Sequence, residues 1–426
     1  MDQITAKLVK EQPSYAFSVG IDWADESHAL CQRRWADGQR QDFKIPADPV
    51  SVQAWLTELK VQAGPQGRVL VGFEQSRSAL FEMLRAQGDW LELYPLNPLT
   101  VSRYRKALFT SGAKDDPLDG QLIEELIYHH RDRFRPYEAP EPELRKLELL
   151  CQQRRKAVDM TTACENELRS TLKVFYPLAL ELHEELGCTL TLHFLKRWPT
   201  LQLLKKAKPE SLRSFYYQHQ SRSRTLIQQR LEKIASAQAV TEDAALIEPM
   251  VLTLRRLVKQ LLDLQASVRT FDKAIKELFS RHPAHHLFES LPGAGAQLAP
   301  RILAAFGCQS QADCSQMQKK TGIAPIVDRS GQSCQVRRRY CRNKFLGQTL
   351  FEFAGCSIPH CSWAKAFYTQ ARARGKTHNV AVRALAFKWI RVIAALWRQQ
   401  TPYDENRYLE ALRSRRSPLG KIIPFS

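Results

Sequence analysis

One run of apolar residues constrains the fold of this chain more than any other feature. Between positions 250 and 278, apolar side chains recur at alternating steps of four and three residues. Held for about four repeats, this spacing favours a coiled-coil arm that pairs with another helix or another chain. The alternative is a long amphipathic helix packed within its own domain. The residues of this seam are Met250, Leu254, Leu257, Leu261, Leu264, Val268, Phe271, Ile275 and Leu278.

The seam lies in a helical, coiled-coil middle region, residues 137–284, which separates two regions with different sequence patterns. Residues 1–136 alternate short apolar runs with amphipathic segments, which predicts an α/β domain built on a mixed sheet. Residues 285–402 are typical of a helical and basic domain, and residues 403–426 of a basic, loosely ordered tail. The predicted fold class is therefore α/β plus all-α.

The charge of the chain indicates the chemistry of its partner. Its 426 residues include 63 Lys and Arg against 44 Asp and Glu, a formal net charge of +19. Such an excess predicts a polyanionic partner, either nucleic acid or an anionic membrane surface. No stretch approaches the ~20 apolar residues that span a bilayer, and the first residues lack a secretory apolar core. We therefore expect a cytoplasmic protein that binds nucleic acid and no membrane.

The ten cysteines are scattered and form no CxxC pair. In a long chain without an export signal, reduced and often buried thiols are the default. The group from Cys334 to Cys361, with His360, raises zinc as an option. Its spacings, C-x6-C and C-x4-C, miss the tight pattern of structural zinc sites. Zinc is therefore the less favoured interpretation.

Four carboxylates in the first region form the candidate catalytic centre. Asp22 follows the core of the first apolar strand, and Glu74 ends the second. Asp116 and Asp119 stand three residues apart at a helix start, so their side chains share a face. The four can converge if the two strands are neighbours. All-oxygen ligation suits Mg²⁺, and two such ions suit phosphodiester chemistry.

Each carboxylate also has a purely structural explanation. Asp116, followed by a proline, is a standard helix N-cap, and Asp119 can favour the positive end of the same helix. Asp22 can be a turn residue at a strand end, and Glu74 can cap the next helix. Each explanation suffices singly, but all four must hold at once to remove the metal site.

Four segments resemble the N-terminal RuvC-like (DEDD) domain of bacterial insertion-sequence transposases, the family described as bridge-RNA-guided recombinases. They are "VGIDWADESHAL", "GFEQSRSALFEML", "LYPLNPLTVSRYRKAL" and "KDDPLDGQLIEEL".

The last segment departs from the family form K-T-D-x-x-D-A. Asp115 replaces the Thr, and a proline and a glycine stand at positions 117 and 120, while the aspartate pair at 116 and 119 is kept. Asp115 can also replace Asp116 as a ligand. The resemblance implies an RNase H/RuvC-like sheet, a nucleic-acid contact at Lys114, and four catalytic residues that hold Mg²⁺. These residues are Asp22, Glu74, Asp116 and Asp119.

The third region opens with a glycine turn, "LPGAGAQLAPRILAAFG". Gly293 and Gly295 follow Pro292 and lead into a helix, which leaves backbone N–H groups suited to a phosphate. The turn resembles the DNA-backbone turn of helix-hairpin-helix domains. The alternative is a glycine-assisted connection between two helices.

Ser330 precedes Gly331 in "TGIAPIVDRSGQS", and by itself this pair indicates only a loop. The same transposase family has, in its C-terminal domain, a P-G-x-G turn, a G-L-x-P…S-G segment and a basic stretch, in the order found here. The resemblance implies that Ser330 is a nucleophile that forms a covalent phosphoserine link with DNA, with Ser333 as the nearby fallback.

A basic stretch follows in "QVRRRYCRNKF", with Tyr340 among the cations. It predicts phosphate contacts, and the alternative is a solvated charge run. The expected nucleic-acid-binding residues here are Arg337, Arg338, Arg339, Arg342 and Lys344.

The resemblance therefore implies an insertion-sequence transposase that cuts and rejoins DNA, and the four carboxylates predict Mg²⁺ as its metal. The resemblance adds its partners: donor and target double-stranded DNA, a non-coding guide (bridge) RNA, and further copies of the chain, as a dimer or dimer of dimers. It also implies a bacterial, nucleoid-associated location. Two alternatives stay open. One is a RuvC-type structure-specific endonuclease that uses activated water, and the other is a non-catalytic nucleic-acid-binding protein.

Overall fold

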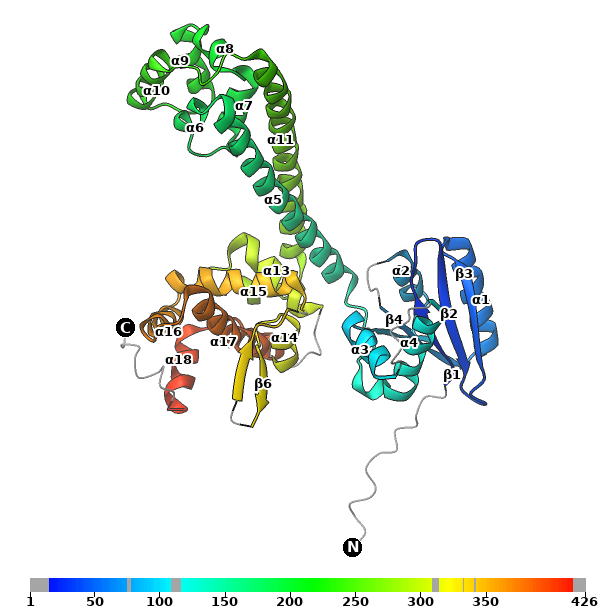
Figure 1. Cartoon of the computed structure of the whole chain (residues 1–426). Helices are drawn as coiled ribbons and strands as arrows, with labels where there is room; N and C mark the ends of the chain where they lie inside the picture. Colours follow the sequence, from blue (N-terminus) through cyan, green and yellow to red (C-terminus); the bar gives the residue numbers. More distant parts are fainter. Residues whose placement is uncertain are drawn as a thin grey trace. The chain divides into compact units, whose positions relative to one another are not determined.

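The computed structural model describes residues 15–74, 78–108, 116–308, 314–331, 333–340 and 342–416, with only the backbone of residues 116–118. The chain divides into two compact units, Met1–Ala139 and Pro140–Ser426 (Figure 1). Among the helices described, none is long and apolar enough to cross a lipid bilayer.

The first unit is built on a five-stranded sheet. Its strands are β1 (Tyr15–Asp22), β2 (Ser27–Arg34), β3 (Arg40–Pro46), β4 (Arg68–Phe73) and β5 (Leu91–Pro95). They lie in the order β3-β2-β1-β4-β5. β1, β2 and β3 pair antiparallel, whereas β1, β4 and β5 pair parallel. The α/β domain on a mixed sheet that the sequence predicts is confirmed.

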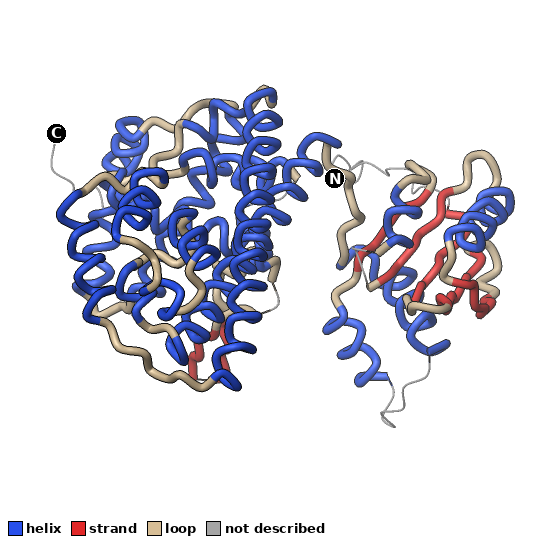
Figure 2. The backbone as a smooth tube through the Cα atoms, turned by 90° about the horizontal axis from the view of Figure 1, so that it is seen from above, coloured by secondary structure: helices blue, strands red, loops and turns tan. Residues whose placement is uncertain are grey.

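Helices cover both faces of this sheet, because successive side chains of a strand point to opposite faces (Figure 2). On one face the core includes Val19, Ile21 and Val71, and on the other it includes Leu70. The first face carries α1 (Pro49–Ala63) and α2 (Ala79–Arg85), and the second carries α3 (Pro98–Leu108) and α4 (Asp116–His130), which the short 3₁₀ turn η1 (Arg131–Arg133) follows.

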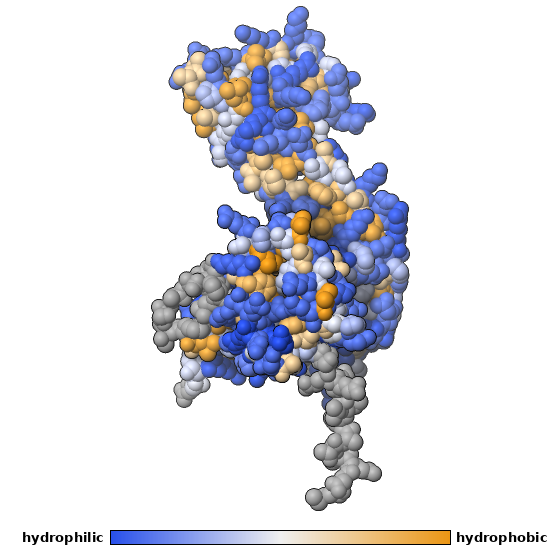
Figure 3. Space-filling model, turned by 90° about the vertical axis from the view of Figure 1, so that its right-hand side faces the viewer, coloured by the Kyte–Doolittle hydropathy of each residue, from blue (hydrophilic) through white to orange (hydrophobic). Residues whose placement is uncertain are grey.

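The second unit contains a long two-helix arm, formed by α5 (Pro142–Phe175) and α11 (Ala244–Arg281). The two helices run antiparallel, since Arg154 Nε lies 2.8 Å from Asp272 Oδ1 at one end and Arg256 bonds Glu167 at the other. The predicted heptad seam lies on α11, and α5 of the same chain is its partner. Hydrophobic side chains are visible along this arm among hydrophilic ones in Figure 3.

Each end of the arm enters a separate hydrophobic core. At one end, Leu254, Leu257 and Leu261 are fully buried. At the other end, Ile275 and Phe279 are buried. The first core includes α6 (Leu178–Leu182), α7 (Thr189–Arg197), α8 (Leu201–Lys205), α9 (Pro209–Gln218) and α10 (Arg224–Ser236).

The second core is the C-terminal region, and it buries Trp363 and Trp389 completely. Its helices are α12 (His285–Glu289), α13 (Gly295–Gly307), α14 (Cys314–Lys320), α15 (Lys344–Ser357), α16 (Ser362–Ala373), α17 (His378–Gln399) and α18 (Glu405–Ser414), with the 3₁₀ turn η2 (Ile358–His360).

Two features of this region differ from the sequence expectation. An antiparallel hairpin of β6 (Ile326–Ser330) and β7 (Ser333–Arg337) stands in a segment expected to be helical. The start of the expected loose tail is the helix α18, because Asp404 caps its first N–H groups and Leu409 packs into the core. The two strands have five residues each, and α18 has one buried apolar residue, so neither leaves a clear periodic pattern in the sequence. Contacts with the rest of the fold determine both elements.

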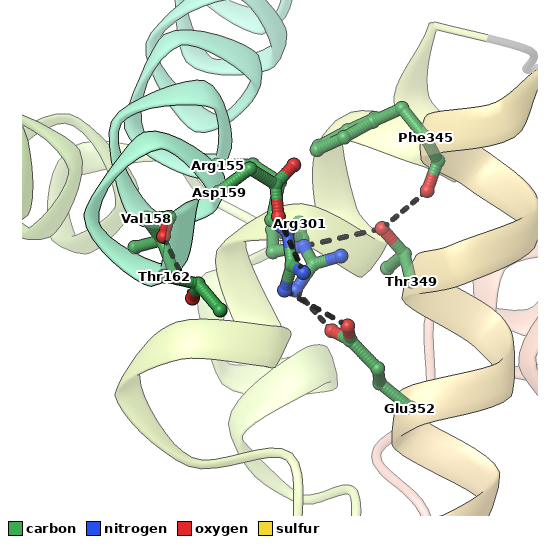
Figure 4. A network of polar contacts seen from close by, with 8 residues as sticks. All are labelled: Arg155, Val158, Asp159, Thr162, Arg301, Phe345, Thr349 and Glu352. Carbon is green, nitrogen blue, oxygen red and sulfur yellow. Dashed lines mark hydrogen bonds and ion pairs between the residues drawn. The ribbon is translucent and has the colours of Figure 1, made fainter. Parts of the chain in front are cut away.

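A polar network joins the arm to the C-terminal helices (Figure 4). Arg301 of α13 is 5% exposed; its Nη1 donates to Glu352 Oε2 of α15 at 2.6 Å, and its Nε donates to Thr349 Oγ1 at 3.1 Å. Arg155 of α5 donates from Nη1 to the other oxygen of Glu352 at 3.0 Å. One carboxylate therefore bridges two guanidinium groups from different helices, and Arg155 also pairs with Asp159 of its own helix.

We expect Glu352→Gln to lower the free energy of unfolding by about 3 kcal/mol, because it leaves the buried Arg301 without its counter-charge. Urea unfolding of the full chain, followed by circular dichroism, measures this loss. Glu410→Gln removes an exposed carboxylate of α18 and is the matched control, with an expected change within about 0.5 kcal/mol. Equal stability of the two variants would contradict a structural role for the network.

Candidate active site and nucleic-acid interface

Two acids leave the sheet side by side. Asp22 is the last residue of β1, and Glu74 follows directly after β4. The two strands run parallel with Ile21 paired to Phe73, so both acids emerge at the same edge of the sheet. Neighbouring strands lie about 4.8 Å apart, which brings the two backbones to adjacent positions there.

The α4 helix lies directly on these two strands. Gly20 of β1 is paired with Gly72 of β4, and both face α4. A Cβ atom at position 20 would lie 2.1 Å from the carbonyl oxygen of Gly120, and one at position 72 would lie 2.9 Å from Ile123 Cγ2. Helix and sheet can come this close only because no side chain stands between them.

This contact also positions Asp119, which directly precedes Gly120 on α4. Because side chains alternate along a strand, Asp22 shares the sheet face of Gly20, which α4 covers. Asp119 is buried, and its carboxylate forms an ion pair with Arg105 of α3. Asp22 and Asp119 therefore share the sheet face that α4 covers, and the Glu74 backbone emerges at the same edge of the sheet.

These acids do not form a closed cluster. Among the side chains that the structure describes, no three His, Cys, Asp or Glu residues lie close enough together to hold a metal ion. Asp119 is engaged by Arg105 instead. Asp116 begins α4, but only its backbone is described, and Lys114 and Asp115 fall outside the described residues. The four-carboxylate site therefore stays a prediction.

The sequence patterns did not reveal a buried acid behind this edge. Glu124 of α4 is fully buried and accepts hydrogen bonds from Ser18 Oγ at 2.5 Å and from Arg33 Nη2 at 2.7 Å. The Arg33 guanidinium also lies over the Tyr128 ring, 4.0 Å from its centre. Burial, with smaller effects of nearby carboxylates, raises the pKa of the Cys31 thiol, which stays protonated. This network holds α4 on the sheet. In the sequence, the buried acid is indicated only by a glutamate within the apolar run "QLIEELI".

We expect Gly20→Ala to destabilise the first unit by about 3 kcal/mol, because the added methyl group forces α4 off the sheet. Thermal unfolding of the full chain measures the shift. Gly355→Ala in α15 is the control, since a Cβ there has no neighbour within 4 Å and Ala favours the helix. A Gly20→Ala protein as stable as the wild type would disprove the close packing.

Ser330 stands at the tip of the β6–β7 hairpin. It is the last residue of β6 and pairs with Ser333, the first residue of β7. Both serines are exposed. Gly331 follows with a φ of +55°, a backbone conformation that favours glycine in such tight connections. The hairpin therefore exposes two hydroxyl groups, and its geometry does not distinguish between them.

The glycine turn leads into α13 as the sequence indicates. Gly293 has a φ of +77°, and a Cβ there would lie 2.5 Å from the carbonyl oxygen of Cys356. Gly295, with a φ of +54°, begins α13 and is exposed together with the next two residues. The preceding Ala294 has no side chain that could cap the helix. The first N–H groups of α13 can therefore donate hydrogen bonds to an anion.

The basic stretch is not a uniformly solvated run. Arg337, Arg338 and Lys344 are exposed, whereas Arg339 and Arg342 are half-buried. Burial, helped by two neighbouring arginines, lowers the pKa of Arg342. Crowding of cations at a partly buried position favours a bound anion, which supports the predicted phosphate contacts.

Two family models match the chain. A model of the DEDD domain of IS110-type transposases, described as "Transposase", matches residues 19–177. A second model, described as "Transposase IS116/IS110/IS902 family", matches residues 285–369. The first includes the carboxylates at the sheet edge, and the second includes the glycine turn and Ser330. The protein is therefore a DNA transposase, an enzyme that recombines the DNA of an insertion element.

Relatives extend this likeness over nearly the whole chain. The IS117 mini-circle protein of Streptomyces coelicolor is 25% identical over 397 residues, which are 91% of this chain and 95% of the relative. The 44.8 kDa protein of insertion element IS116 from Streptomyces clavuligerus is 24% identical over 386 residues, 90% of this chain and 94% of the relative. The 42 kDa protein of IS900 from Mycobacterium paratuberculosis is 31% identical over 153 residues, 35% and 38% of the two chains. The chain belongs to the IS116/IS110/IS902 family of transposases.

Proposed function

We propose that this transposase cuts and rejoins DNA through a covalent phosphoserine link at Ser330, with Mg²⁺ held by four carboxylates. The observation that carries this proposal is the parallel pairing of β1 with β4, which ends in two acids at neighbouring positions. The order of the five strands supports a RuvC-like fold for this domain. The four carboxylates are those of Asp22, Glu74, Asp116 and Asp119.

The donor set suits a hard divalent cation, because all four groups are carboxylates and one of them, Asp119, is buried with a cation as its partner. When bound, Mg²⁺ would polarise the scissile phosphate and stabilise the charge that grows in the transition state. Arg105 holds Asp119 in place and must share or release this carboxylate when a metal binds. The DEDD domain match supports a divalent metal, and Mg²⁺ is our choice among such ions.

Ser330 supplies the nucleophile. Its Oγ forms a bond to phosphorus and gives up its proton, the bond from phosphorus to the leaving sugar oxygen breaks, and that oxygen takes up a proton. The phosphodiester energy is kept in the serine ester, so a second strand end can reverse the step and rejoin the DNA. The exposed hairpin tip supports this role, since it can reach a bulky duplex.

The proposed partners are donor and target double-stranded DNA and a non-coding guide RNA. The net charge of +19 and the cations around the hairpin support binding of both polyanions. Structured RNA would be bound by its shape and phosphates rather than by its sequence. Arg337, Arg338, Arg339, Arg342 and Lys344, together with Lys114, Gly293 and Gly295, are the proposed contacts.

The proposed assembly is a dimer or a dimer of dimers. In the middle of the arm, Leu264 and Val268 of the seam stay partly exposed, which supports packing against a second copy. The proposed division of labour is a catalytic DEDD domain in residues 1–136, a dimerisation region in 137–284, a serine transposase domain in 285–402 and a basic tail in 403–426.

The test is to trap a protein–DNA adduct that survives denaturation. The full chain is incubated with its element-end DNA, the element's non-coding RNA and Mg²⁺, and the products are separated in detergent. We expect a DNA-linked band that disappears when a chelator removes the metal. Cleaved DNA without any linked protein would instead favour the RuvC-type endonuclease, and binding without cleavage would favour a non-catalytic role.

A further inference from the structure

A pocket beside the serine hairpin has no role in the mechanism described above, apart from the proposed phosphate contacts of Arg337 and Arg338 in its lining. Its volume is about 550 Å³, within the range of small-ligand sites. It lies between the residues at the base of the β6–β7 hairpin and the helices α16 and α17, all within the second unit.

The floor of this pocket is apolar. Phe367 of α16 and Phe387 of α17 contribute aromatic rings, and Ile323 also lines the pocket. Val336 and Val380, which also line it, are 66% and 44% exposed. Apolar side chains that are this exposed next to a pocket form a surface that a ligand can cover.

The rim of the pocket is cationic. Lys388 Nζ lies 5.1 Å from the centre of the Phe367 ring, and the Arg391 guanidinium lies 5.5 Å from that of Phe387. Among the ion pairs that the described residues form, none includes Arg383, Lys388 or Arg391. Burial, and next the neighbouring arginine of each, lowers the pKa of Arg383 and of Lys388. An anion would relieve this crowding of positive charge.

We propose that this pocket takes one unpaired nucleotide, with the base on the apolar floor and the phosphates on the cationic rim. The proposal rests on the nucleic-acid binding proposed above. Bases of single strands stack on aromatic rings and on arginine planes, while the backbone follows a positive groove, so one site with both features fits a nucleotide. An acidic peptide would use the rim but leave the aromatic floor unexplained.

The hairpin sets the distance between this pocket and the serine. Val336, in the pocket wall, pairs with Val327, which stands three residues before Ser330. Three strand residues span about 10 Å. The pocket wall therefore lies about 10 Å along the strand from the serine at the hairpin tip.

The test is equilibrium binding by the full chain carrying Ser330→Ala, so that no chemistry intervenes. The probes are labelled oligothymidylate, oligouridylate and a sugar–phosphate chain without bases, each about eight nucleotides long. We expect Ala384→Trp, which fills the pocket from an exposed position of α17, to weaken binding of the base-bearing probes about tenfold and to leave the baseless chain unaffected. The stronger of the two base-bearing probes identifies DNA or RNA as the source.

Arg383→Gln tests the rim. It should weaken all three probes and lower the slope of log affinity against log salt by about 0.7, whereas Arg374→Gln, the same charge change outside the pocket, should leave the slope unaltered. Unchanged thermal unfolding shows that each variant is folded, and Ala384→Leu gives a smaller loss as a second variant. Equal binding of thymidylate by wild type and Ala384→Trp would overturn the proposal, and so would an oligoglutamate peptide that binds the pocket as well as thymidylate does. Neither result depends on Ser330 chemistry.

Discussion

A protein carrying Ser330→Ala should form no denaturation-resistant DNA adduct and should lose strand exchange by about 10⁴-fold or more. The methyl group cannot form the phosphoserine ester that stores the energy of the phosphodiester bond. The DNA end therefore cannot become linked to the protein, and rejoining cannot follow. Labelled DNA resolved in detergent measures the adduct, and joined product measures strand exchange. Because the serine is exposed at a hairpin tip, thermal unfolding should be unchanged.

Ser333→Ala is the matched control for this substitution. The two serines are paired across the hairpin, both are exposed, and they lie on opposite sides of Gly331 in the sequence. We expect the Ser333→Ala protein to keep its adduct. The reverse pattern would move the nucleophile to Ser333, and an adduct present in the double variant would end the hairpin mechanism.

Asp22→Asn and Glu74→Gln should each lower DNA cleavage by about 10³-fold while DNA binding stays unaltered or tightens slightly. The amides keep the shape of the side chains but remove the charge that a divalent cation needs. The partial loss should also shift the Mg²⁺ concentration for half-maximal cleavage upward. Cleavage measured across a magnesium titration, with binding measured separately, distinguishes loss of metal from loss of DNA.

Asp25→Asn is the control for both variants. It removes the same charge from an exposed turn just after β1, so it should leave cleavage and its magnesium dependence unchanged. Full cleavage by the Asp22→Asn protein would show that this acid is only a strand-end residue. An equal loss of cleavage in the Asp25→Asn protein would show that the effect comes from the change in net charge and not from a lost metal ligand.

Part of the candidate site can be predicted from the sequence alone. Asp22 and Glu74 each follow a short apolar run, and such runs predict buried strands from composition alone. Which strands become neighbours does not follow from either run, because pairing joins residues about fifty positions apart through contacts with no local signature. The structure supplies that step by pairing Ile21 with Phe73.

Other parts of the site were hidden for the same reason. Glu124, Ser18 and Arg33 are unremarkable in the sequence, yet one buried carboxylate joins two strands and a helix. The pocket beside the hairpin combines segments from Gly322 to Arg391 that are separated by several elements. Charge counting predicted cations in this region but not that they would surround aromatic rings.

The heptad seam separates what the sequence determines from what only the tertiary structure determines. Its periodicity determined a long helix with one apolar face, because that spacing can be satisfied by local backbone geometry alone. It left open whether the partner would be another helix of the chain, a second chain or the body of a domain. Only the tertiary structure decided that α5 of the same chain packs along the seam and that its two ends enter separate cores. The choice of partner depends on the free energy of contacts between segments distant in sequence, and no single segment carries that information.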